Sequence, residues 1–399
     1  MSTQQRKWLE EVDIMRAFGI LAVLAIHATG PSVTLSPKSC AYNILMGLNY
    51  SLAFAVPVFL FISAMVLSFK YSKEENTNWL KFYKSRMNQI IIPYLVWTGI
   101  YLLYRAFLFH ENFRVFTTPG FVDDAKFIIK TLFLGKGYIH LYFISIIVQF
   151  YIAFPLITMV FNYFVRTYNK LFKDESKKEQ TAVKIANFCL YFLLILGCQY
   201  AFIVVNKFYI YPYFKYPGVM LLSYIMPIGM GIWLGYNYDN WKKYVGIVRT
   251  FAYPLAIIFG WLFVNVSMNN WFLGKPDANL IAMIRNVYVT FASIIVFEIG
   301  LYIKDNWNGW FRKDLADLGA CSFGIYLLHL LILKTMHKYN ILSLGGSNML
   351  LYGLMMLVTF IVTLAGSWIA VKLINMTPLA PILFGNRKVV KNIKKNKID

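Results

Sequence analysis

The chain has 399 residues, of which 59% are hydrophobic and 14% charged, and its mean hydropathy is +0.55. A soluble globular protein is excluded, because its surface would be far too apolar. The net charge of +21 comes from basic residues scattered through the polar segments, without a nucleic-acid-binding motif. Membrane lipid is therefore the expected partner, and nucleic acid is not.

Apolar segments long enough to cross about 30 Å of hydrocarbon recur along the whole chain. They predict an all-α, polytopic membrane protein with about ten transmembrane helices. We expect a single membrane domain over residues 1–385 and a short basic cytoplasmic tail over 386–399. The predicted spans are residues 12–30, 48–69, 89–109, 138–162, 185–206, 219–237, 251–268, 279–303, 316–336 and 349–374.

Basic residues predict the sidedness of these spans. Most of the 39 lysines and arginines fall in segments that ten spans would place on one side of the membrane. The positive-inside rule makes that side cytoplasmic, and an even number of spans places both termini there. Without an evident cleavable signal, the chain is expected in the plasma membrane, with its tail near anionic lipid headgroups.

The first span carries an arginine and a histidine on one face. Arg16 and His27 are eleven residues apart, which is about three helical turns and about 16 Å along the axis. Arginine inside a span is costly without a partner, and Asp13 is a local one. The alternative is that both side chains snorkel to opposite headgroup layers.

The third, fourth, eighth and ninth spans add further polar groups. Lys84 and Arg86 precede or open the third span from the cytoplasm, whereas His140 opens the fourth from outside. The depth of each polar residue in the membrane is estimated by counting about 1.5 Å per residue from the end at which its span enters. These depths predict two polar layers with a passage between them. The outer layer comprises His27, His140, Arg285 and His329, and the inner layer comprises Asp13, Arg16, Arg86 and Glu298.

Histidine chemistry makes His27 the candidate general base of the outer layer. An imidazole has an ordinary pKa of about 6.5, close to working pH, and so suits the activation of a hydroxyl. The alternative is a histidine that only hydrogen-bonds a neighbouring helix. In the ninth span Ser322, Tyr326 and His329 share one face that should point inward. Ser322 and Tyr326 fit helix-to-helix hydrogen bonding better than chemistry.

Four segments together resemble the acyltransferase-3 type of integral membrane acyltransferases, in order along nearly the whole chain. The first span resembles the family's Arg-x10-His signature, and the residues around Pro93 resemble its basic segment before Ile-x-Pro-Tyr. The other two resemble its His-Leu-Trp-Phe element and its late Ser-Tyr-x-Ile-Tyr-Leu-x-His element. The residues concerned are Asp13 to His27, Phe82 to Tyr94, His140 to Phe143 and Ser322 to His329.

The resemblance implies a function and roles for these residues. The family moves acyl groups from cytoplasmic acyl-coenzyme A to glycans outside, so the chain is expected to be an O-acyltransferase. His27 would be the catalytic base and Arg16 would help to hold the donor. His140 and His329, which the depth estimate places in the outer layer with His27, are expected to help offset the oxyanion charge. Arg86 would meet coenzyme A, assisted by Lys84. Acetyl or succinyl groups are expected, on a surface or secreted glycan, without a metal.

Two departures from the family pattern bear on the donor and on partners. Gln89 stands where an Arg-x-x-Arg pattern has its second arginine, so the donor phosphates would depend more on Arg86, Lys84 and Lys81. Tyr142 stands where tryptophan is usual. We expect no extracellular hydrolase-like domain of the kind that some members carry, so a separate extracytoplasmic transferase or glycan-synthase subunit is expected to complete the transfer.

A polysaccharide exporter or flippase is the rival reading, because a polar passage through ten spans would also serve it. The titratable groups concentrate in two narrow layers, which favours the enzyme over a conduit. A structural subunit of a synthase complex is a third reading. Transfer or hydrolysis of acyl-coenzyme A by the purified protein separates the enzyme from both.

Overall fold

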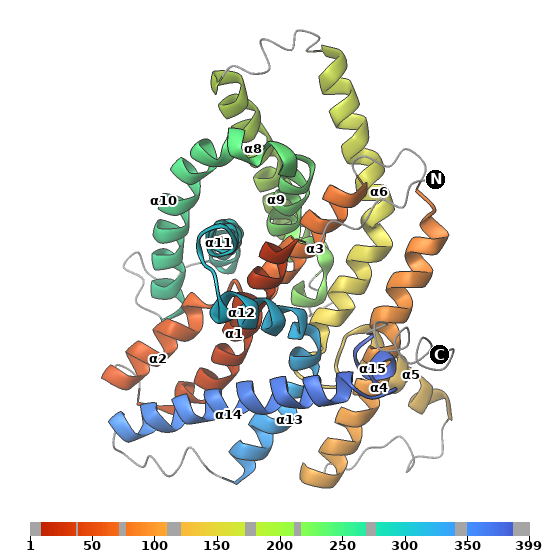
Figure 1. Ribbon diagram of the computed structural model, residues 1–399, viewed down its shortest axis with the longest axis vertical. Helices are drawn as coiled ribbons and strands as arrows, with labels where there is room; N and C mark the ends of the chain where they lie inside the picture. The colour runs from red at the N-terminus through yellow and green to blue at the C-terminus, as the bar shows by residue number, and fades with distance from the viewer. Residues whose placement is uncertain are drawn as a thin grey trace. The chain divides into compact units, whose positions relative to one another are not determined.

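The computed structural model describes residues 9–36, 39–71, 77–109, 121–171, 181–210, 217–268, 277–339 and 349–385. Within these ranges every regular element is a helix (Figure 1), which confirms the all-α prediction. Long apolar helices are the expected solution for this composition, because a helix satisfies its backbone hydrogen bonds internally and lipid offers no partners.

The predicted spans each have a helical counterpart. Eight helices in the described ranges are long and apolar enough to cross a membrane. The ninth predicted span is a pair of helices, α12 (Trp310–Ala320) and α13 (Ser322–Lys338), which meet at 75°. The predicted span at 219–237 corresponds to a shorter apolar helix over Leu221–Tyr236. About ten membrane segments therefore agree with the structure, although two of them depart from a straight, full-length helix.

The chain forms two compact units, each made of two stretches of sequence. Unit 1 comprises Met1–Leu67 and Met226–Trp368, and unit 2 comprises Ser68–Ile225 and Ile369–Asp399. The predicted membrane domain over residues 1–385 stays a prediction. The predicted tail over 386–399 lies outside the described residues.

Unit 1 holds most of the helices in the described ranges. Its elements in chain order are α1 (Glu10–Thr29), η1 (Gly30–Thr34), α2 (Cys40–Ser51), α3 (Ala55–Tyr71), α9 (Ile225–Tyr236), η6 (Tyr238–Asn240), α10 (Trp241–Ser267), α11 (Ala278–Asn306), α12, α13 and α14 (Met349–Asn375). Two of them, α3 and α14, continue into the residues of unit 2. The most extensive helix pairings in it are α10 with α11 and α1 with α12.

Helix α1 is packed on several sides within unit 1. It contacts α11, α12, α13 and α2 (Figure 1). Two glycines allow this close approach, because a Cβ atom on Gly300 would lie 2.9 Å from the backbone oxygen of Glu11. A Cβ atom on Gly319 would lie only 1.7 Å from the backbone oxygen of Asp13. Small residues at helix interfaces let backbones approach in this way.

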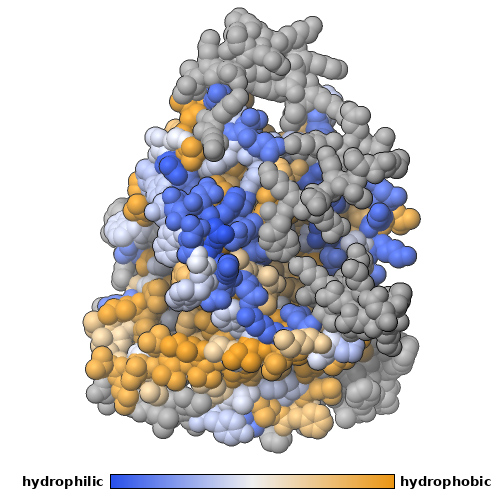
Figure 2. All heavy atoms as spheres, viewed as in Figure 1, coloured by the Kyte–Doolittle hydropathy of each residue, from blue (hydrophilic) through white to orange (hydrophobic). Residues whose placement is uncertain are grey.

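The surface of unit 1 separates apolar from polar side chains. Figure 2 shows an apolar band along α14 and a hydrophilic patch over α12 and the turn that precedes it. Leu350 on α14 is 85% exposed, as expected for a lipid-facing helix. Other exposed apolar residues of α14 are Leu354, Leu357, Ile361, Ile369 and Leu373.

Unit 2 contains the remaining helices. They are α4 (Trp79–Phe109), α5 (Phe121–Phe133), α6 (Tyr142–Leu171), α8 (Thr181–Val205), η3 (Asn206–Ile210), η4 (Pro217–Val219), η5 (Leu221–Tyr224) and α15 (Ala380–Phe384). The short α15 is fastened to α4, where Trp97 Nε1 donates to the Leu383 carbonyl at 2.8 Å. Gly385 follows it with φ +65°, and a Cβ atom there would lie 2.2 Å from the Gln89 carbonyl oxygen, so only glycine fits.

Candidate active site

Arg16 lies near the N-terminal end of α1 and has the predicted local partner. Its Nη1 atom lies 2.8 Å from Oδ1 of Asp13, one turn earlier on the same helix. The Asp13 side chain is only 3% exposed, whereas that of Arg16 is 37% exposed. The carboxylate therefore neutralises the guanidinium from the buried side. The exposed part of the guanidinium keeps donors available for an anionic ligand.

His27, near the C-terminal end of α1, lies beside His329 of α13. The ring centroids are 5.3 Å apart and the planes are tilted by 42°. His27 is half-buried and His329 is fully buried. The structure thus brings together two of the four residues of the predicted outer layer. Arg285, a third, is half-buried on α11.

The backbone of α13 sets the tautomer of His329. Its Nδ1 lies 2.7 Å from the Tyr326 carbonyl oxygen and 3.2 Å from that of Ile325. Carbonyl oxygens only accept hydrogen bonds, so in the neutral ring we assign the proton to Nδ1 and the lone pair to Nε2. His329 can therefore accept a hydrogen bond at Nε2, which suits a residue that orients another imidazole.

The predicted polar stripe of α13 points inward. Ser322 is 5% exposed and Tyr326 is 4% exposed, and the Tyr326 ring lies 5.9 Å from that of His329. The stripe begins directly after Cys321, where α12 ends and the chain bends by 75°. The bend starts α13 inside unit 1 and places His329 beside α1.

Two side-chain hydrogen bonds hold the α1 end that carries His27. Asn49 of α2 donates through Nδ2 to the Ile26 carbonyl and to Thr29 Oγ1, both at 2.8 Å. Thr29 in turn donates to the Ala25 carbonyl at 2.7 Å. The Ile26 carbonyl also accepts the backbone N–H of Gly30, so Asn49 adds a second hydrogen bond to it from a neighbouring helix. Asn49 was not among the predicted site residues, because a single asparagine at the start of the predicted span 48–69 carries no signal of its own.

A buried carboxylate that the sequence analysis missed fastens the other end of α1. Glu11 has a fully buried side chain, and its Oε2 lies 3.1 Å from Nζ of Lys304 on α11. Its Oε1 accepts a hydrogen bond from the Tyr238 hydroxyl. Both oxygens of the carboxylate are thus engaged, which is the condition under which a buried charge is tolerated. In the sequence Glu11 looks like an ordinary charged residue flanking a span.

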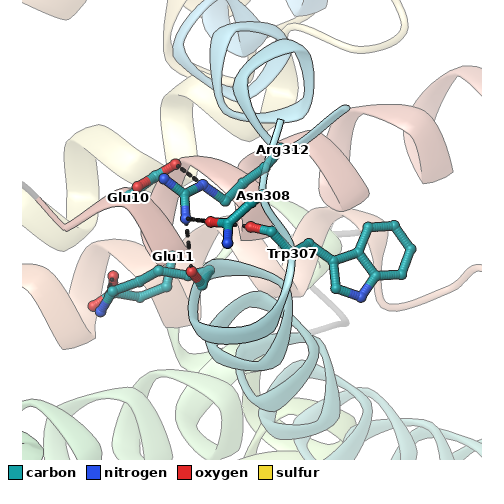
Figure 3. Close-up of polar contacts among 6 residues, drawn as sticks. Glu10, Glu11, Trp307, Asn308 and Arg312 are labelled. Atoms are coloured by element: carbon teal, nitrogen blue, oxygen red, sulfur yellow. Dashed lines mark hydrogen bonds and ion pairs between the residues drawn. The ribbon is translucent and has the colours of Figure 1, made fainter. Parts of the chain in front are cut away.

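A second ion pair beside Glu11 joins α1 to α12. Arg312 Nε lies 3.0 Å from Oε1 of Glu10, and its Nη1 donates to the Lys304 carbonyl at 2.9 Å. Figure 3 shows the guanidinium of Arg312 between Glu10 and Asn308 at the turn that joins α11 to α12. We name Glu10, Glu11, Lys304 and Arg312 the α1 latch. It connects the helix that carries Arg16 and His27 to two others.

Glu298, predicted for the inner layer, pairs with α10. Its Oε2 accepts from Arg249 Nε at 2.9 Å and from the Tyr253 hydroxyl at 3.1 Å. The Glu298 side chain is 3% exposed and that of Arg249 is 58% exposed. These contacts fasten α10 to α11. They explain the buried position of Glu298 by its role in holding the two helices together.

The other predicted site residues lie in unit 2. Arg86 is half-buried on α4, with its guanidinium carbon 5.5 Å from the Tyr151 ring centroid, and Lys84 is exposed. His140 is 2% exposed and lies against Tyr101 and Tyr138. Arg16 and His27 belong to unit 1. That Arg86 acts with Arg16, and His140 with His27, stays a prediction.

The described residues of α1 and α13 provide groups for acid and base chemistry. Within the ranges that the structure covers, no group of three or more His, Cys, Asp or Glu side chains could hold a metal ion. Two adjacent imidazoles can take up and return a proton. A half-exposed arginine on the same helix can bind phosphate or carboxylate oxygens.

Comparisons with known proteins identify the family. The acyltransferase-3 family, described as an acyltransferase domain, matches residues 9–372. Curated relatives from Staphylococcus aureus strains MSSA476, MRSA252 and Mu50 are each 24% identical over 290 residues. The match covers 72% of this chain and 71% of each relative, and each is named "Probable poly-beta-1,6-N-acetyl-D-glucosamine export protein". No solved structure gives a significant match.

Proposed function

This chain belongs to the acyltransferase-3 family, and from that membership we propose an integral membrane O-acyltransferase that acylates a polysaccharide. The donor is cytoplasmic acyl-coenzyme A carrying an acetyl or succinyl group, and the acceptor is a hydroxyl of an extracytoplasmic polysaccharide. The observation that carries the proposal is the His27 and His329 pair. His27 lies near one end of α1, and Arg16 lies near the other end of that helix.

His27 is the proposed general base. Its imidazole takes the proton from the acceptor hydroxyl while the hydroxyl oxygen attacks the thioester carbonyl. When the carbon–sulfur bond breaks, the imidazolium returns the proton to the leaving thiolate, so that the products are the ester and free coenzyme A. His329 orients the His27 ring through the contact between the two imidazoles. General base catalysis of this kind contributes about 10²–10⁴-fold in rate.

Cations supply the proposed donor-binding groups. Arg16 offers a planar fork of donors, and Asp13 holds it in place. Arg86 and Lys84 add positive charge at the start of α4. In the proposal they bind the 3′-phosphate and diphosphate of coenzyme A, which carry its negative charge.

The name of the relatives supports a polysaccharide as the acceptor. They are named for a β-1,6-linked polymer of N-acetylglucosamine, and such a polymer presents free hydroxyls at which an ester can form. We therefore propose a β-linked hexosamine polysaccharide as acceptor, and the plasma membrane as the location where cytoplasmic donor and external glycan meet.

Export is the second candidate function, because the same relatives are named as export proteins. An exporter moves the glycan without consuming a thioester. The two functions therefore predict different chemical products from the same purified protein.

The test uses the full chain in proteoliposomes supplied with acetyl- or succinyl-coenzyme A. A β-1,6-linked N-acetylglucosamine oligosaccharide is the acceptor. We expect an oligosaccharide mass increase of one acyl group, together with free coenzyme A. Transport of unmodified oligosaccharide without release of coenzyme A would contradict the proposed acyltransferase and support the exporter.

The proposal also requires the predicted sidedness. Cys40 is exposed at the start of α2, on the side predicted to be external. In a variant without the other cysteines, Cys40 should react with an impermeant maleimide added outside intact cells. A cysteine introduced as Asp305→Cys, in a variant that also lacks Cys40, should react only after permeabilisation. The reverse pattern would place His27 near the cytoplasm and make the acceptor a cytoplasmic one.

A further inference from the structure

Aromatic rings from two segments meet on the α4 side of unit 2. Tyr101 of α4 is fully buried, and the Tyr138 ring stacks on it with centroids 4.5 Å apart and planes tilted by 20°. The edge of His140 meets the same ring at 4.9 Å. Tyr104 stands edge-on to Tyr138 at 6.3 Å. We name Tyr101, Tyr104, Tyr138 and His140 the tyrosine cluster.

Two glycines hold the segment that brings Tyr138 and His140 to α4. Gly135 has φ +64°, and a Cβ atom on it would lie 2.3 Å from Cα of Tyr142. A Cβ atom on Gly137 would lie 2.8 Å from Cγ2 of Thr98. Side chains are excluded at both positions, so the segment folds tightly onto α4. The rings are thus held in place before a ligand arrives, which lowers the entropic cost of binding.

Burial within the tyrosine cluster is graded. Tyr101 and His140 are buried, whereas Tyr104 and Tyr138 are half-buried and keep part of their surface available. Tyrosines that only anchor a protein in the headgroup layer act as separate amphipathic side chains. Here Tyr101 is fully buried against the stacked Tyr138 ring, whereas Tyr104 and Tyr138 keep accessible surface. The buried His140 packs against both Tyr101 and Tyr138.

The depth of the tyrosine cluster follows from the length of α4. Tyr104 lies twenty residues beyond Lys84 on the same helix, which corresponds to about 30 Å, the thickness of the hydrocarbon core. If the lysine end faces the cytoplasm, Tyr104 lies at the outer surface, where a secreted glycan is present and acyl-coenzyme A is not.

We propose that the tyrosine cluster is a pyranose-binding subsite for the acceptor glycan. A β-linked hexose with equatorial substituents has apolar C–H faces that stack on aromatic rings, and its hydroxyls pair with polar groups at the ring edges. Tyrosine supplies both a flat apolar ring and a hydroxyl. The choice of glycan as occupant rests on the proposed function. In this role the buried His140 supports the rings of Tyr101 and Tyr138.

The test measures binding of a β-1,6-linked N-acetylglucosamine pentasaccharide to the full chain in lipid nanodiscs by calorimetry. Tyr138→Leu and Tyr104→Leu remove the flat rings while keeping apolar volume, so the packing beneath them is retained. We expect each change to raise the pentasaccharide Kd by about tenfold and both together by more. The Kd of acyl-coenzyme A should change by less than twofold in the same samples.

Phe107→Leu is the matched control, because Phe107 lies on the same helix end and is 78% exposed. It should leave the pentasaccharide Kd unchanged. Absence of pentasaccharide binding in the wild type, unchanged Kd in both tyrosine variants, or an equal loss in Phe107→Leu would overturn the subsite.

The outcomes separate this inference from the proposed function. Weakened pentasaccharide binding in the tyrosine variants, together with no acyl transfer by the wild type, would support the subsite and refute the enzyme. Acyl transfer by the wild type, with an unchanged glycan KM in both variants, would refute the subsite alone.

Discussion

The two ends of α1 are held by different chemistry. The N-terminal end is fastened by charge, because Glu11 pairs with Lys304 and Glu10 with Arg312. The C-terminal end is held by neutral hydrogen bonds from Asn49 and by the ring contact between His27 and His329. Arg16 lies between the two ends.

The difference separates anchoring from chemistry along one helix. An ion pair with a buried member holds two helices together but is sensitive to loss of either partner. Neutral hydrogen bonds orient the histidine end without adding a charge to it. Changes at the latch should therefore alter stability, whereas changes at the histidine end should alter rate.

The largest effect is expected at the histidine end. His27→Ala removes the proposed base and should lower acyl transfer by about 10²–10⁴-fold. Alanine suits an apolar helix, so expression and melting temperature should stay near those of the wild type. Transfer to the oligosaccharide is measured by mass spectrometry, with His329→Ala beside it. His329→Ala should cost less, and substantial transfer by His27→Ala would exclude His27 as the base.

Changes in the α1 latch should lower the free energy of unfolding. Glu11→Ala leaves Lys304 without its carboxylate, and fully buried pairs lose about 3–5 kcal/mol when one partner is removed. Lys304 is 35% exposed and can turn to water, so we expect a loss nearer to about 2 kcal/mol. Thermal unfolding in nanodiscs measures it. The companion variant Lys304→Met should recover part of the loss in the double mutant, because both charges are then removed.

Variants of Arg16 test whether the N-terminal part of α1 binds the donor. Arg16→Ala should weaken binding of acyl-coenzyme A by about tenfold, the size of one charge-assisted hydrogen bond. Arg16→Lys should weaken it less, because lysine keeps the charge but lacks the planar fork. Equilibrium binding of a non-hydrolysable acyl-coenzyme A analogue gives the affinities. Equal affinity in Arg16→Ala and the wild type would make Arg16 a membrane anchor only.

The smallest effect is expected at Asn49. Asn49→Ala removes two hydrogen bonds to α1 and should cost about 1 kcal/mol of stability. It should also lower kcat by about threefold to tenfold while leaving the donor KM unchanged, because it shifts the His27 end without contacting the donor. Leu48→Ala, on the same helix and 46% exposed, is the control. A change in donor KM with unchanged kcat would contradict a positioning role for Asn49.

The sequence by itself determined the features that depend on local periodicity. Apolar segments of span length predicted the helices, and the spacing from Asp13 to Arg16 predicted their ion pair. The spacing of Ser322, Tyr326 and His329 likewise predicted one buried face. Helical geometry repeats every 3.6 residues, so neighbours within a helix can be read without knowing the fold.

Tertiary structure alone decided which helices meet and where a span bends. The contact of His27 with His329 joins residues about 300 positions apart, and the 75° bend at Cys321 lies within the span predicted over residues 316–336. Hydropathy is insensitive to both, because it sums transfer free energies along the chain. Glu11 looked like a flanking charge until Lys304 and Tyr238 were brought to it. Contacts between helices depend on packing of distant side chains, and no local spacing encodes them.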